Sequence, residues 1–415
     1  MASVVGEEIG EIVGGGARRS ATDVVVGRYA WIVLVVVFLG GVAATLSQYE
    51  VPPLMPLLMR AFGVDLAAAG SLMSIFAVTG AVLALPSGYI LQRLGVSTAG
   101  VAALGTVIIG GVLGAVAGNF DALLLSRALE GVGLGLIAIV APTVIAAWFP
   151  LESRGLPMGI WATWVPVGGV VMFNTAPALA ARGGWQLVWW LGAGFCLVSL
   201  LLYRALVRMP AAVAVRTDDG GPNAGEPGLR RAMRNRSIWL LALAFCLYCI
   251  SQGALSTFYP TFLVSKQGYS LAAASTLSSL SMVTVLFSCP LAGLVSDRLR
   301  SRKLVFTVPT LLLAGTWLFP FVISGWQIPV FMVLTGLLGG AVATAVWAAV
   351  PEVMDHPRLV GMGMAILMLG QSVGYSIGPA VFSRLVQTLG WADAGYAWIP
   401  LALAAATVGW FVEVR

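Results

Sequence analysis

The stretch Leu66–Ala–Ala–Ala–Gly–Ser–Leu72 recurs later in the chain as Leu271–Ala–Ala–Ala–Ser–Thr–Leu277, with each residue number higher by 205. At the same offset two further pairs match, Gly88 with Gly293 and Arg93 with Arg298. One heptapeptide could match by chance, but several aligned features at one offset indicate an internal duplication. The two halves of the chain are therefore predicted to have the same fold.

The composition of the 415-residue chain excludes a soluble globular protein, because 59% of its residues are apolar and only 10% are charged. Soluble domains carry about 25% charged residues, so the polar surface here could not cover the apolar interior. The net charge is +6, but the basic residues lie near the ends of apolar segments and are not interleaved with aromatic residues. We therefore predict that a lipid bilayer surrounds the protein and that it has no nucleic-acid partner.

Apolar runs long enough to cross a bilayer as helices, about 20 residues each, recur twelve times along the chain. The predicted fold class is an all-α membrane protein with twelve transmembrane helices, arranged as two pseudo-symmetric six-helix bundles. The predicted spans are 29–59, 68–91, 98–117, 121–146, 158–180, 186–206, 237–264, 271–295, 303–324, 327–350, 359–385 and 392–413.

The polar, Gly-containing stretch 207–236 divides the twelve spans six and six, and its composition is typical of a flexible linker. We accordingly predict an N-terminal bundle at 27–206, a C-terminal bundle at 237–415 and a disordered tail at 1–26, which lacks the apolar core of a signal peptide. Most of the 23 Lys and Arg residues lie in the tail, the linker and the loops on the same side. The positive-inside rule then predicts a multi-pass protein of the cell inner membrane with both termini in the cytoplasm.

Residues 293–303, which follow the eighth predicted span, have the sequence GLVSDRLRSRK. This segment resembles the signature loop of the major facilitator superfamily, in which Gly-x-x-x-Asp-Arg is followed by basic residues. In that family the loop makes cytoplasmic contacts between helices that latch one conformational state. The resemblance therefore implies a gating role for Gly293, Asp297 and Arg298.

The equivalent segment of the first half retains Gly88 and Arg93, for which the resemblance also implies gating, but Gln92 replaces the expected acid and weakens a charged latch. Arg127 and the spaced glycines that follow it in the fourth span also resemble a motif of this family. The resemblance covers most of the chain. It implies a monomeric secondary transporter, not an enzyme, that moves a small-molecule substrate by alternating access between its two bundles.

Two short motifs concern the branch of the family. In the fifth span, residues 164–169 differ from the signature of drug antiporters, because Val165 replaces a glycine and the spacing to the Gly-Gly pair is one residue shorter. In the eleventh span, residues 374–379 resemble the branch that contains cyanate and nitroimidazole transporters. The main hypothesis is a transporter of a small polar or anionic solute. The alternatives are a drug/proton antiporter and, in another class, a non-transporting membrane receptor or scaffold.

Three ionisable residues, Glu50, Arg127 and Glu130, lie inside predicted spans. Such residues are costly within a bilayer and indicate a functional site. At 1.5 Å of rise per helical residue the three lie at comparable depth, so they can form one cluster. The cluster is interpreted either as a proton-coupling site, where burial and the neighbouring Arg act in opposite directions on the carboxylates, or as a permanent structural ion pair.

Polar residues recur at helical spacing on one face of the seventh span, which predicts a face that lines a wet cavity. The first, fifth and eleventh spans offer further polar or aromatic positions. Glu50 points about 160° away from Gln48, so Glu50 is expected to face a neighbouring helix rather than the cavity. The predicted substrate-binding residues are Thr45, Gln48, Tyr49, Trp161, Trp164, Tyr248, Gln252, Ser256, Tyr259, Gln371 and Tyr375.

The sequence predicts no metal and no cofactor. All four cysteines lie in apolar stretches, and the Cys246–Leu–Tyr–Cys249 pair lacks the second half of a metal site. The chain has no Walker motif, so ATP is not the predicted source of energy. A proton is the predicted coupling partner.

Overall fold

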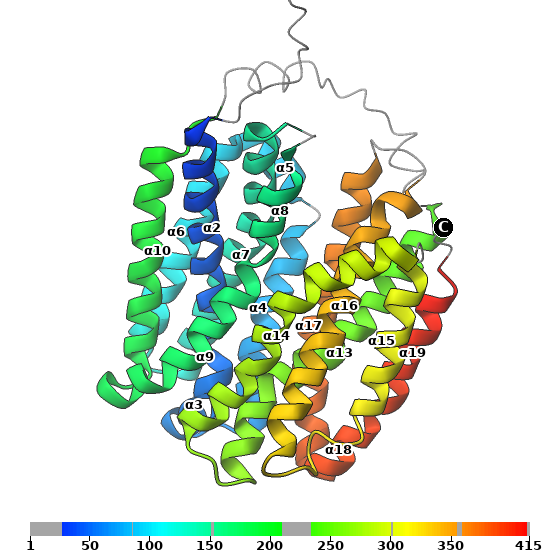
Figure 1. Cartoon of the computed structure of the whole chain (residues 1–415). Coiled ribbons are helices and arrows are strands. Elements are labelled where there is room, and N and C mark those ends of the chain that lie inside the picture. Colours follow the sequence, from blue (N-terminus) through cyan, green and yellow to red (C-terminus); the bar gives the residue numbers. More distant parts are fainter. Residues whose placement is uncertain are drawn as a thin grey trace, which may run out of the picture.

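The computed structural model describes residues 27–84, 86–150, 153–209, 234–299, 302–354 and 359–412, and all regular elements in these ranges are helices. They form two bundles that stand side by side (Figure 1). The apolar runs fold as helices because hydrocarbon leaves backbone N–H and C=O groups no partner outside their own segment.

The N-terminal bundle consists of α2 (Arg28–Gln48), α3 (Val51–Phe62), α4 (Leu66–Ala84), α5 (Ser87–Leu94), α6 (Val96–Ala115), α7 (Phe120–Trp148), α8 (Gly155–Ala162), α9 (Trp164–Gly183) and α10 (Gln186–Leu206). The C-terminal bundle consists of α13 (Arg236–Ser265), α14 (Leu271–Leu299), α15 (Arg302–Thr316), α16 (Gln327–Val353), α17 (Val360–Leu389), α18 (Trp391–Ala397) and α19 (Ile399–Trp410). Within the described ranges, ten helical segments are long and apolar enough to cross a membrane. The shorter α15 and the α18–α19 pair supply the other two spans, so the prediction of twelve spans in two bundles is confirmed.

The predicted span 303–324 is wrong in its second half, because α15 ends at Thr316 and the chain then forms turns up to residue 326. Pro320 has no backbone N–H to donate and restricts the residue before it. Gly325 ends the turns in the left-handed region, with φ +58°. Trp317 and Phe321 are buried by this change of direction and stabilise it.

Other predicted spans are broken next to proline. The helix that begins with α2 is interrupted at Tyr49 and Glu50, because Pro52 and Pro53 cannot donate the backbone hydrogen bonds of a continuous helix. Pro400 accompanies the same kind of break between α18 and α19. The break at Tyr49 and Glu50 leaves Glu50 between two helices inside the N-terminal bundle.

The two ends of the bundles differ in how the bundles meet. We call the end at which α10 finishes and α13 begins the linker end, and the opposite end, where α3 and α18 lie, the distal end (Figure 1). The bundles contact each other through α3 with α13, α4 with α17, and α9 with α14. Asn174 of α9 also donates a hydrogen bond from Nδ2 to Ser279 Oγ of α14, at 3.0 Å. At the linker end, α5 and α8 pack on helices of their own bundle.

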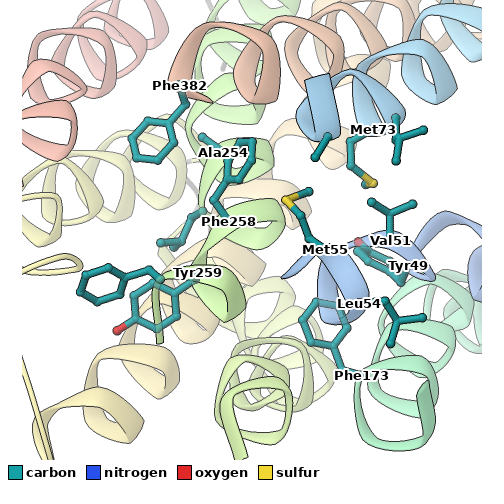
Figure 2. Packing of buried hydrophobic residues seen from close by; sticks show 14 of the residues in the cluster. Tyr49, Val51, Leu54, Met55, Met73, Phe173, Ala254, Phe258, Tyr259 and Phe382 are labelled. Carbon is teal, nitrogen blue, oxygen red and sulfur yellow. The ribbon is translucent and has the colours of Figure 1, made fainter. Parts of the chain in front are cut away.

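An apolar layer closes the distal half of the contact between the bundles. Met55 of α3 belongs to the same buried cluster as Ala254 and Phe258 of α13, and Figure 2 shows these side chains facing one another across the interface. Gly70 of α4 brings that helix close to Phe258, with the position of an added Cβ only 2.9 Å from the Phe258 ring. The bundles are therefore sealed together on the distal side.

The predicted tail at 1–26 lies outside the described residues, as does the predicted linker except for residues 207–209 and 234–236. Their assignment stays a prediction. The residues that flank the linker are held by side-chain bonds to the backbone of their own bundles: Tyr29 OH donates to Leu206 O at 2.6 Å, and Asn235 Nδ2 donates to Val353 O at 2.9 Å.

Candidate functional site

Three charged side chains are fully buried in the described part of the chain, and they form one cluster in the N-terminal bundle. Arg127 of α7 forms ion pairs with Glu130, one turn further along the same helix, and with Glu50, at 3.6 Å from Nη1 to Oε2. Arg127 Nη1 also donates to the backbone carbonyl of Ser47 at 2.8 Å. We call Glu50, Arg127 and Glu130 the triad. The structure thus brings the three predicted coupling residues together.

The residues around the triad leave little space and are mostly apolar. The Phe76 ring of α4 lies against the Arg127 guanidinium, 4.5 Å from Cζ to the ring centroid, in the geometry of a cation–π contact. Gly110 of α6 leaves room for Glu130, since a Cβ at position 110 would lie 2.6 Å from Glu130 Cγ. Gly192 of α10 similarly contacts the Glu50 carboxylate. Small residues on the neighbouring helices therefore make the space that the two carboxylates occupy.

The triad holds two carboxylates and one guanidinium in a site that no solvent reaches. Five of its polar atoms have no hydrogen-bond partner among the described residues, namely both oxygens of Glu50, Arg127 Nε and Nη2, and Glu130 Oε1. A buried polar atom left without a partner costs about 1–3 kcal/mol. A net buried charge costs more, and such a group neutralises by binding a proton instead. One proton shared by the two carboxylates would make the triad neutral.

The C-terminal bundle carries a neutral pocket of about 40 Å³. It is bounded by α13, α14 and α16 of this bundle and by Phe173 of α9 from the other bundle. Hydroxyl, amide and thioether groups line it, and none of the lining residues is charged. The lining residues are Phe173, Gln252, Leu255, Ser256, Tyr259, Ser278, Ser281, Met282, Met332 and Thr335.

The polar face predicted on the seventh span is divided between this pocket and the interior of the bundle. Gln252, Ser256 and Tyr259 line the neutral pocket. Tyr248 is instead buried, and its hydroxyl donates to the Gly339 carbonyl of α16 at 3.1 Å. In this conformation the Tyr248 hydroxyl is thus bonded to a neighbouring helix, and its role in substrate binding stays a prediction.

Of the first-span candidates, only Gln48 is partly exposed. Thr45 is fully buried, with its hydroxyl bonded to the Gly41 carbonyl at 3.0 Å and its side chain packed against Gly168 of α9. The close approach of α2 and α9 covers Thr45 in this conformation, and its role in substrate binding stays a prediction. Tyr49 is buried with its ring edge-on to Phe173, at 5.9 Å between centroids, and so lies beside the pocket wall.

The remaining substrate-binding candidates lie at contacts between helices. Trp161 and Trp164 stack on each other with centroids 4.7 Å apart, and both contact Gly41 of α2. Trp161 is buried, while Trp164 is partly exposed. Gln371 and Tyr375 of α17 are also partly exposed, so these two and Trp164 remain available to a solute.

The two signature segments are helical, which corrects their description as loops. Gly88 and Arg93 belong to α5, and Gly293 and Arg298 belong to α14, which runs on to Leu299. The stretch 294–299 contains Leu and Arg, which favour helix, and neither Gly nor Pro. Arg93 and Arg298 are exposed at the linker end, and the side chain of Asp297 lies outside the described residues. Gating by these segments stays a prediction.

Several residues of the site were not anticipated. Met332 and Thr335 of α16, and Ser278 and Ser281 of α14, line the neutral pocket. The spacing of Ser278 and Ser281 at i and i+3 is a helical-face signal of the kind that predicted the polar face of α13. Phe76, which covers Arg127, had no such signal, because an apolar residue in an apolar span looks the same whether it faces lipid or a guanidinium.

The family model described as Major Facilitator Superfamily matches residues 37–357 and 286–415 of the chain. Among curated proteins, human Protein spinster homolog 1 is 27% identical over 254 residues, which are 58% of this chain and 47% of the human protein. The match thus spans about half the length of that relative. The hexuronate transporter of Bacillus subtilis (strain 168) is 22% identical over 377 residues, which are 86% of this chain and 88% of that protein.

Solved structures share the fold. A bacterial homolog to the human lysosomal transporter Spinster, in an inward-facing and unoccupied conformation, superposes with a TM-score of 0.77 at 16% identity, covering 93% of this chain and 97% of that chain. A D-xylose-proton symporter superposes with a TM-score of 0.75 at 16% identity, covering 92% of this chain and 98% of that chain.

Proposed function

The chain belongs to the Major Facilitator Superfamily, and from this premise we propose that it is a proton-coupled secondary transporter of a small polar or singly charged solute. It is a multi-pass membrane protein and not an enzyme. The observation that carries the proposal is the difference in chemistry between the two bundles. A fully buried triad with two carboxylates lies in one bundle, and a neutral pocket of hydroxyl and amide groups lies in the other.

The triad is suited to proton coupling because its charge depends on one proton. With both carboxylates ionised it carries one net negative charge, and with one carboxylate protonated it is neutral. A conformational change that opens the triad to water favours the charged form, and one that seals it favours the neutral form. Proton binding thereby favours one orientation of the bundles over the other, which is the requirement for coupled transport.

The lining of the neutral pocket supports a small polar substrate. Its donors and acceptors are uncharged, and the partly exposed Gln48, Gln371 and Tyr375 extend the same chemistry. The hexuronate transporter and the D-xylose-proton symporter among the similar proteins are named for polar solutes. We therefore favour a hydroxylated or carboxylated solute over an amphipathic drug. The cyanate and nitroimidazole branch has no support among the relatives that we compare, and we do not propose it.

The described conformation supports alternating access as the mode of transport. The bundles are sealed by the apolar layer around Met55 and Phe258 on the distal side, while α5 and α8 at the linker end pack on their own bundle. We take the linker end to be cytoplasmic, since most Lys and Arg residues lie there. The protein would then face the cytoplasm in this state, as a monomer in the cell inner membrane, with Asp297 and the basic residues near it contributing to closure at that end.

Reconstitution of the purified chain in liposomes with trapped pyranine tests the proposal. A thermal-shift screen of hexuronates, pentoses, polyols, amides and amphipathic drugs selects the solute, and proton uptake is then recorded on its addition. We expect a sugar-like solute to stabilise the protein and to drive proton movement that Glu130→Gln abolishes. Solute uptake without proton movement would remove the coupling, stabilisation by drugs alone would favour a drug/proton antiporter, and the absence of any uptake would favour a receptor or scaffold.

A further inference from the structure

A second set of buried polar groups lies in the N-terminal bundle beside the triad. It consists of the Trp189 indole N–H on α10 and the Ser126 hydroxyl on α7, which are fully buried and have no hydrogen-bond partner among the described residues. Both groups flank Gly114 of α6. A Cβ at that position would lie 2.5 Å from Trp189 Nε1 and 2.6 Å from Ser126 Oγ, so the two groups are neighbours.

This pair is continuous with the triad on two helices. Ser126 and Glu130 are four residues apart on α7 and therefore lie on the same face. On α10, Gly192, which contacts the Glu50 carboxylate, follows Trp189 by three residues. Since α7 and α10 both begin at the distal end, the pair lies on the distal side of the triad. The separation along α7 is about 6 Å at 1.5 Å per residue.

The pair also lies close to the distal surface. Trp189 is within one turn of Gln186, the first residue of α10. Trp185 packs edge-on against Trp189, with ring centroids 5.3 Å apart, and Phe62 of α3 contacts both Trp185 and Phe120. These aromatic rings form a lid, and the polar groups beneath it lead to the carboxylates. The neutral pocket lies elsewhere, mainly in the other bundle.

We propose that Ser126 and Trp189 hold a water that passes protons between the distal surface and the triad, along a route inside the N-terminal bundle that is separate from the substrate pocket. A serine hydroxyl accepts and donates hydrogen bonds at once, and an indole N–H donates one. Together with the unbonded carboxylate oxygens they offer the two to four polar partners that hold a water in a protein interior. That water gives a proton to a carboxylate oxygen while it accepts one from water at the distal surface, so it stays neutral, and the reverse transfers release the proton. This route rests on the proposed proton coupling.

The other polar groups near the route do not compete for the proton. Cys196, on α10 one turn beyond Gly192, directs its thiol to the Leu104 carbonyl at 3.5 Å. The Arg127 guanidinium is a hydrogen-bond donor and offers no acceptor atom to the water. Glu50 and Glu130 are therefore the acceptors that the route reaches.

The test measures how fast the triad binds a proton. The full chain in nanodiscs is subjected to a rapid pH jump, and the C=O infrared band of the protonated carboxyl is followed in time, with Glu130→Gln used to assign it. Trp189→Phe keeps an aromatic ring, a smaller one without the N–H, and Ser126→Ala removes the hydroxyl with little change of volume. Trp398→Phe is the matched control, because Trp398 is also buried with an unbonded N–H but lies in the bundle that lacks the triad.

We expect each route variant to slow protonation about tenfold, equivalent to about 1.36 kcal/mol of barrier, without moving the pH midpoint of the band or the unfolding temperature. Trp398→Phe should keep the wild-type rate.

Wild-type rates in both Ser126→Ala and Trp189→Phe would overturn the route while leaving the coupling intact, and so would an equal slowing in Trp398→Phe. A shifted midpoint with an unchanged rate would mean that the two residues only shape the site. If Trp189→Phe fails to fold, Ser126→Ala alone decides the matter. A wild-type chain without any pH-dependent carboxyl band would instead overturn the proposed coupling.

Discussion

The two bundles are copies of one framework that carry different chemistry at equivalent positions. Gly131 of α7 lies against the Phe76 carbonyl and the Thr79 hydroxyl of α4, and Gly336 of α16 makes the same contacts with Ser281 and Thr284 of α14. Each residue of the second set is numbered 205 higher than its counterpart. The duplication seen in the sequence is therefore also a duplication of helix packing.

The same correspondence places the triad opposite neutral residues. Arg127 corresponds to Met332 and Glu130 to Thr335, both of which line the neutral pocket. Glu50 corresponds to Ala254 at the neighbouring offset that aligns Gln48 with Gln252. One copy thus has charge where the other has a pocket. On the proposed function, proton binding and solute binding fall to separate copies of one site.

The largest effect is expected from Arg127→Met. This change gives the N-terminal bundle the residue type that the C-terminal bundle has at the equivalent position. The two buried carboxylates then lose their cation, and breaking a buried ion pair costs about 3–5 kcal/mol. We expect a lower unfolding temperature and no proton-driven accumulation of solute in liposomes. Arg60→Met, at an exposed position in the last turn of α3, is the control and should behave as wild type. Near-normal proton-driven accumulation in Arg127→Met would separate the triad from coupling.

The second-largest effect is expected from a triple variant that regains stability but does not regain proton coupling. The triple change Glu50→Ala, Arg127→Met and Glu130→Thr copies the neutral set of the C-terminal bundle. Replacing a buried ion set by apolar residues is often neutral or stabilising by about 1–4 kcal/mol, so the unfolding temperature should return to the wild-type value or above it. Transport down a solute gradient should persist, while a pH gradient should no longer drive it. Recovery of proton-driven transport would show that the charges are only structural.

The extent to which the sequence predicted this arrangement follows from the kind of signal involved. Hydrocarbon imposes long apolar helices, so the spans and the duplication were visible without a structure. The charged residues were also visible, because Arg127 and Glu130 are rare in such segments. The sequence did not show which side chains fill the contacts between helices. Thr45 and Tyr248 have the polarity of cavity residues, but close helix approach and the bond to Gly339 occupy them.

A smaller effect is expected from Gln252→Leu, which removes an amide from the neutral pocket. One hydrogen bond contributes about 0.5–1.5 kcal/mol, so the KM for solute should rise by up to about tenfold with little change in the unfolding temperature. Its counterpart Gln48→Leu lies on the N-terminal copy and should change KM less. Uptake kinetics of the two variants, measured side by side, decide between the copies. An equal or larger effect of Gln48→Leu on KM would contradict the proposal, because it would place solute binding on the N-terminal bundle.

The smallest effect concerns the seal at the distal end. Asp65 precedes α4, and its carboxylate accepts hydrogen bonds from Ala68 N–H at 2.7 Å and from the Gln387 side chain of α17 across the interface. These bonds hold the pKa of Asp65 below its ordinary value. Their contribution is therefore complete above the ordinary aspartate pKa, and it is lost as the pH falls through the lowered one. Because the carboxylate is exposed, the contribution to closure is small.

Acidification of the distal side into that range should then increase the fraction of molecules open at the distal end, and Asp65→Asn should remove this part of the pH response. Spin labels at Gly118→Cys and Lys266→Cys, exposed sites at the distal ends of the two bundles, report the separation by electron resonance. The native cysteines are buried or half-buried and are shielded from labelling. The triple variant that lacks the triad should retain the Asp65 response, because the seal joins the bundles directly rather than through the charged copy. A response that vanished with the triad would place the pH sensitivity of the seal in the N-terminal bundle instead.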